Sequence, residues 1–122
     1  MRDLKNLIFF DDLLQESYNA LVRQAKEDGK YALGYTCYFM PEVLLDLPGC
    51  FSVRLRAPRC TSPDMATYYM SSRVCHYARS LLERALEGGY NFIDAQLGTE
   101  TCTGTCRFQE HLAELPDLIQ NE

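Results

Sequence analysis

Apolar residues follow a helical spacing in three parts of the chain. Between residues 9 and 28 they recur every three or four positions, which predicts one amphipathic helix before Gly29. A second helical pattern covers residues 71–87, where Ser71 or Ser72 is suited to cap the first turn. A third pattern covers residues 105–115 and stops at a proline.

Short, continuous apolar runs lie between these helical stretches. They cover residues 31–36, 50–55 and 91–97 and predict three buried strands. A short helix at residues 41–47 and a turn of helix at residues 64–70 fill the connections. Because helices alternate with strands, we expect an α/β fold, an N-terminal helix followed by half of a doubly wound parallel sheet with three layers.

The chain has 122 residues, which is the length of one domain. We expect residues 1–29 to form an N-terminal helical segment and residues 30–122 to form a partial α/β domain. Residues 117–122 are not expected to add a strand. A complete doubly wound sheet would need two or three strands more than the three predicted. We therefore expect a fragment of a larger domain, or a subunit that borrows its missing edge.

Composition excludes several classes of protein. Hydrophobic residues make up 47% of the chain and charged residues 24%, which indicates a globular protein with a core. The net charge of -5 argues against binding nucleic acid through its phosphates. No apolar run approaches the roughly 20 residues of a membrane span. Because the N-terminus does not resemble a signal peptide, we expect a cytoplasmic protein, in which six cysteines suggest metal ligands or reactive thiols.

Three of these cysteines fall where strands lead into helices. Cys37 follows the first predicted strand, Cys102 follows the third, and Cys75 lies in the first turn of the helix after the second. In a parallel sheet these junctions share one edge, and helix N-termini there favour the thiolate form of cysteine. Three thiolates on separate loops suit an iron–sulfur cluster better than the paired spacing of zinc sites. The alternative is that each is a small buried residue.

The other cysteines leave more than one interpretation open. Cys50, at the start of a strand, is expected to be structural, and Cys60 lies in a loop with no decisive pattern. Cys106 follows Cys102 by four residues, so the two would share a helical face and form a metal or redox pair. A small zinc or thiol-redox protein is therefore one alternative function.

Histidine and arginine residues give weaker signals. His76 and His111 are expected to be surface or structural residues. Arg54, Arg56 and Arg59 form a basic patch in an acidic chain, which suits either a phosphate-bearing ligand, such as coenzyme A, or a solvated loop.

Five segments, in their order along the chain, resemble the 2-hydroxyacyl-CoA dehydratase family and its D-component-like members. That family also includes benzoyl-CoA reductase subunits and double-cubane-cluster proteins. The resemblance runs from Gly34 to Leu112. The segments are Gly34-Tyr-Thr-Cys-Tyr-Phe-Met-Pro-Glu42, Ser52-Val-Arg-Leu55, Tyr69-Met-Ser-Ser-Arg-Val-Cys-His-Tyr-Ala-Arg-Ser80, Ala85-Leu-Glu-Gly88 and Thr101-Cys-Thr-Gly104.

The resemblance implies a cytoplasmic iron–sulfur protein of anaerobes, with a [4Fe–4S] or double-cubane cluster between two doubly wound domains. It matches Cys75, Cys102 and Cys37 to cluster ligands. An ATP-driven activator would deliver one electron, which the cluster passes to the thioester of an acyl-CoA so that water is lost. A second dehydratase-like subunit, or the rest of the domain, would be the structural partner.

The chain also departs from the family's pattern. Glu42 is displaced by one position from the usual acidic residue, Thr103 stands where aspartate is common, and Cys106 is extra. Members are several times longer, so we assign no catalytic residue and expect this chain to be too short for activity alone. A second alternative function is a non-catalytic half-domain that binds a partner subunit through an exposed sheet edge.

Overall fold

The computed structural model describes residues 2–115, in which three parallel strands form one sheet. The strands are β1 (Tyr31–Tyr35), β2 (Cys50–Arg54) and β3 (Ala95–Leu97). Strand β1 lies in the centre, and both of its neighbours run parallel to it, in the order β2-β1-β3. The three predicted strands are confirmed, although β3 is shorter than predicted because a turn occupies the residues that follow Tyr90.

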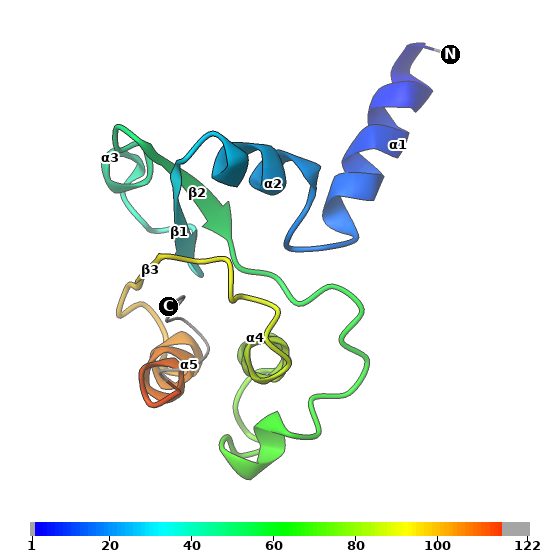
Figure 1. Ribbon diagram of the computed structural model, residues 1–122. Helices are drawn as coiled ribbons and strands as arrows, with labels where there is room; N and C mark the ends of the chain where they lie inside the picture. Colours follow the sequence, from blue (N-terminus) through cyan, green and yellow to red (C-terminus); the bar gives the residue numbers. More distant parts are fainter. Residues whose placement is uncertain (1, 116–122) are drawn as a thin grey trace.

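Helices cover both faces of this sheet, as Figure 1 shows. The helices of the described residues are α1 (Arg2–Leu14), α2 (Ala20–Glu27), α3 (Glu42–Leu45), α4 (His76–Leu86) and α5 (Thr103–Ala113), with a 3₁₀ turn, η1, at Ala66–Tyr68. Helix α2 lies on one face, and α4 and α5 pack against each other on the opposite face. This arrangement confirms the predicted α/β fold with an N-terminal helix; the proposed division at residue 29 stays a prediction.

The prediction of a single helix over residues 9–28 is wrong. The structure has two helices, and the chain between them is not helical. Asn19 causes the break, because its backbone is extended and its side-chain oxygen accepts the N–H groups of Leu21 and Val22. These bonds cap the start of α2. Helix α1 consequently leads away from the rest of the chain (Figure 1).

The start of the fourth helix also differs from the prediction. Neither Ser71 nor Ser72 caps it, since α4 begins at His76 and Cys75 is the preceding cap residue. The Ser71 hydroxyl instead accepts the N–H of Arg73, which stabilises a turn in place of a helix. The predicted stop at Pro116 and the absence of a strand in residues 117–122 lie outside the described residues.

The hydrophobic core lies between the sheet and the pair α4 and α5. Its centre is formed by Leu55, Leu81, Leu82 and Phe108, which are fully buried. Gly34 in β1 permits this packing, because a Cβ atom there would lie only 2.9 Å from Cδ1 of Ile93. The core therefore packs directly against the central strand β1 and supports the loops at the carboxyl end of that strand.

Candidate cysteine site at the sheet rim

The carboxyl ends of the parallel strands form one rim, and Cys37, Cys75 and Cys102 all lie near it. Cys37 follows β1 by two residues, Cys102 is the cap residue of α5, and Cys75 is the cap residue of α4. Cys75 and Cys102 are exposed, Cys37 is half-buried, and all three are free thiols. The predicted gathering at one edge is therefore reproduced, although Cys75 precedes its helix and does not lie within the first turn.

Cys37 is tied to the loop that carries Cys102. The Thr101 hydroxyl donates a hydrogen bond to the Cys37 sulfur over 3.2 Å, across 64 positions of sequence. This bond, together with one from the N–H of Phe39, lowers the pKa of the Cys37 thiol, and the positive charge of Arg54 adds to the effect. The thiolate form of Cys37 is therefore favoured.

Cys102 takes hydrogen bonds from the first turn of its own helix. Its sulfur lies 3.1 Å from the hydroxyl oxygen of Thr105 and accepts the N–H of the same residue over 3.4 Å. These contacts with Thr105 lower the pKa of the Cys102 thiol. The sulfur also lies at the positive end of α5, which stabilises a negative charge.

Cys75 lies against the start of α5. A Cβ atom added at Gly104, two residues after Cys102, would lie 3.1 Å from the Cys75 sulfur. Glycine therefore leaves open the space in front of this thiol. The N-terminal ends of α4 and α5 meet here, which brings Cys75 into the neighbourhood of Cys102.

The donor chemistry of the rim suits an iron–sulfur cluster, which cysteine thiolates hold. Within residues 2–115, no three His, Cys, Asp or Glu side chains are gathered closely enough to hold a single metal ion. A four-iron cluster spaces its sulfur ligands more widely than one ion does, so the finding for a single ion does not apply to a cluster. The residues present therefore fit such a group in donor type.

The remaining cysteines lie elsewhere or lack further ligands. Cys50 is the first residue of β2, at the end of the strand remote from the rim, and its structural role stays a prediction. Cys60 lines a separate depression with Arg59 and Arg84. Cys106 lies one turn after Cys102 on α5, but the described part of the chain provides no third ligand for a zinc site with this pair.

The histidines and Arg56 of the basic patch have structural contacts. His76 lies 3.1 Å from the Ser80 hydroxyl, and His111 packs edge-to-face against Tyr69. The guanidinium of Arg56 donates to the carbonyl oxygens at the end of α1, which are those of Leu13 and Leu14. Arg56 therefore stabilises the chain reversal after α1.

Sequence reasoning missed the hydroxyl groups around the thiols. Threonine occupies every second position from 99 to 105, on both sides of Cys102, and this alternation was the available signal. Tyr77 was also missed: its hydroxyl lies 3.1 Å from the carbonyl oxygens of both Thr36 and Leu55, so it joins the ends of β1 and β2.

Comparison with known proteins identifies the family. The sequence model of the 2-hydroxyglutaryl-CoA dehydratase D-component matches residues 37–120, which is more than half of the chain. The chain belongs to this family. The match begins at Cys37 and includes Cys75 and Cys102, in agreement with the resemblance found in the sequence. No curated protein and no solved structure matches the chain.

Membership makes this a dehydratase-like component. Among residues 2–115, no helix has both the length and the apolar character that crossing a bilayer requires.

Proposed function

We propose that this chain is an iron–sulfur component of a 2-hydroxyacyl-CoA dehydratase-like lyase. Cys75 and Cys102 hold a [4Fe–4S] or double-cubane cluster, with Cys37 as a further ligand. The observation that carries the proposal is the position of three thiols at one sheet rim, inside the segment that matches the family. Their ligand roles agree with the way thiolates bind iron.

When bound, the cluster would supply one electron to the thioester carbonyl of an acyl-CoA; the hydroxyl group would leave with a proton as water, and the electron would be recovered when the enoyl-CoA forms. The protein's own part is to hold and stabilise negative charge at the rim. The positive ends of α4 and α5 lie there, and Thr101 and Thr105 donate hydrogen bonds to two of the sulfurs.

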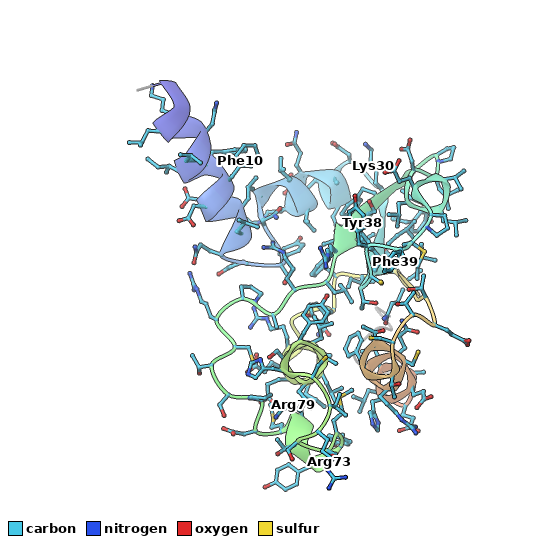
Figure 2. All side chains as sticks on the ribbon, turned by 180° about the vertical axis from the view of Figure 1, so that it is seen from behind. Phe10, Lys30, Tyr38, Phe39, Arg73 and Arg79 are labelled. Atoms are coloured by element: carbon cyan, nitrogen blue, oxygen red, sulfur yellow. The ribbon has the colours of Figure 1, made fainter. Side chains whose placement is uncertain are left out.

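The proposal includes three partners and a compartment. An ATP-dependent activator supplies the electron, an acyl-CoA is the substrate, and a second dehydratase-like subunit or the rest of the domain covers the rim, all in the cytoplasm. Support for a covering protein comes from Tyr38 and Phe39, directly after Cys37, whose side chains are 84% and 75% exposed. Figure 2 shows the two residues side by side near the sheet. Exposed aromatic residues beside a site are typical of protein interfaces.

Anaerobic reconstitution with iron and sulfide tests the ligand assignment. We expect the parent chain to bind iron and to show charge-transfer absorbance, and we expect Cys75→Ala and Cys102→Ala to lose most of both. Cys50→Ala is the matched control, because this cysteine lies away from the rim and should retain the parent's iron content. If the two rim variants bind as much iron as the parent, the proposed ligands are wrong.

The dehydratase role is tested with the complete system. The reconstituted chain is combined anaerobically with a second dehydratase-like subunit, an ATP-dependent activator and a 2-hydroxyacyl-CoA. Formation of the enoyl-CoA product that requires both ATP and this chain supports the proposal. Product formation at the same rate without this chain contradicts it.

A further inference from the structure

One hydroxyl group connects two of the rim cysteines. Thr101 immediately precedes Cys102, and its side chain donates to the sulfur of Cys37, which leaves the sheet from a different strand. The hydroxyl oxygen of Thr99 lies 3.3 Å from that of Thr101 and extends the chain of hydrogen bonds. The two loops are therefore joined at the sulfur itself.

The acceptor of this hydrogen bond is a cysteine sulfur, and Thr101 itself is exposed. A neutral thiol is only a weak acceptor, whereas a thiolate, free or bound to iron, carries negative charge and accepts hydrogen bonds more strongly. The guanidinium of Arg54 adds positive charge near the same sulfur. The surroundings of Cys37 are thus arranged for a sulfur that carries charge.

We propose that Thr101 is a positioning residue of the iron–sulfur site, whose hydroxyl holds the Cys37 sulfur beside Cys102 and stabilises the charge that one-electron reduction adds. This inference rests on the proposed function. Hydrogen bonds to ligand sulfurs are among the factors that set the reduction potential of a cluster, and groups around the ligands also determine how well the metal is retained. Removal of this donor should make reduction less favourable and weaken retention of the cluster.

Thr101→Val tests the inference, because valine keeps the shape of threonine and removes the hydroxyl. The full chain is reconstituted anaerobically and titrated with dithionite in the presence of redox mediators, and the reduced cluster is followed by electron paramagnetic resonance. We expect a more negative midpoint potential than in the parent chain and less iron per chain after gel filtration. Thr101→Ser, which restores a hydroxyl, should return both values towards those of the parent.

Thr103→Val is the matched control, since Thr103 is exposed and flanks Cys102 on its other side. It should leave the potential and the iron content unchanged. Loss of the cluster in Thr101→Val, with retention in Thr101→Ser, also supports the positioning role.

Two results would overturn the inference, and they are distinguishable. A parent chain that binds no cluster removes the proposed function and the inference together. A parent chain that binds a cluster, with the same potential and iron content in Thr101→Val, removes the inference alone.

Discussion

Single side chains join parts of this molecule that are far apart in the sequence. Asp94, just before β3, accepts hydrogen bonds from the Lys26 ammonium over 2.6 Å and from the N–H of Ala32 over 2.7 Å. One carboxylate therefore holds the end of α2, the start of β1 and the approach to β3 together. Partial burial acts to raise the pKa of Asp94, but the hydrogen bonds from Lys26 and Ala32 outweigh it and lower that pKa.

Replacement of this carboxylate should destabilise the fold. For Asp94→Asn we expect a loss of about 1.5 kcal/mol in the free energy of unfolding at neutral pH, because two charge-assisted hydrogen bonds are weakened. Urea unfolding followed by circular dichroism measures this loss. Asp11→Asn, on the exposed surface of α1, is the control and should leave the free energy nearly unchanged.

The stabilisation that Asp94 provides should depend on pH. Because the pKa of Asp94 is lower in the folded than in the unfolded state, its stabilisation is complete above the ordinary carboxyl value of about 3.9 and is lost as the pH falls through the folded value. The difference in stability between the parent and Asp94→Asn should therefore shrink in acid. A difference that stays constant down to the acid limit would contradict this role.

At the scale of elements, one cap residue decides where α1 ends and α2 begins. Asn19 accepts two N–H groups of α2, and its side-chain nitrogen donates to the carbonyl oxygen of Leu13. The helical spacing of apolar residues continues across Asn19, so that spacing does not show that the helix is interrupted there. The competing side-chain hydrogen bonds determine it.

Loss of this cap should be measurable. We expect Asn19→Ala to reduce the free energy of unfolding by about 1 kcal/mol, as is usual for removal of an asparagine N-cap. Asn6→Ala, on the exposed part of α1, is the matched control. Equal stability in the two variants, measured in urea, would mean that the capping bonds of Asn19 do not stabilise the native state.

The close approach of the core to β1 gives a second prediction at this scale. In Gly34→Ala the new methyl group would lie 2.9 Å from Cδ1 of Ile93 and 3.1 Å from Cδ2 of Leu55. Because of this overpacking we expect the free energy of unfolding to fall by about 1–3 kcal/mol, measured from the thermal unfolding transition. Ile93→Val removes the atom nearest to the new methyl group. It should therefore lower the stability less in the Gly34→Ala background than in the parent.

At the scale of the whole molecule, the described residues leave a large apolar surface exposed. Leu4, Leu7, Ile8 and Phe10 of α1 are each more than half exposed, and α1 leads away from the sheet. Figure 2 shows Phe10 on this helix, remote from the sheet. Exposed apolar surface of this kind is typical of proteins that associate with others.

Polar replacements on this apolar surface should leave the fold intact. We expect the double variant Leu7→Gln, Phe10→Gln to bind less of a hydrophobic fluorescent dye than the parent and to unfold at nearly the same temperature, because exposed side chains add little to stability. Leu81→Ala, in the core, is the contrasting control and should lower the unfolding temperature markedly. A large fall in unfolding temperature in the double variant would show that α1 packs against the body.

The sequence alone was enough to predict the three strands, their alternation with helices and the rim shared by Cys37, Cys75 and Cys102. Periodicity reports which positions are buried, and parallel topology then brings the strand ends together. The ligand roles of these cysteines stay predictions.

Only the tertiary structure revealed the bond from Thr101 to Cys37 and the carboxylate of Asp94 that holds Lys26 and Ala32. Their partners are 62 to 68 positions apart. Local patterns of hydrophobicity and propensity do not specify which polar atoms pair at that separation. Such pairs form because the packing of helices on the sheet brings specific polar atoms within hydrogen-bonding distance.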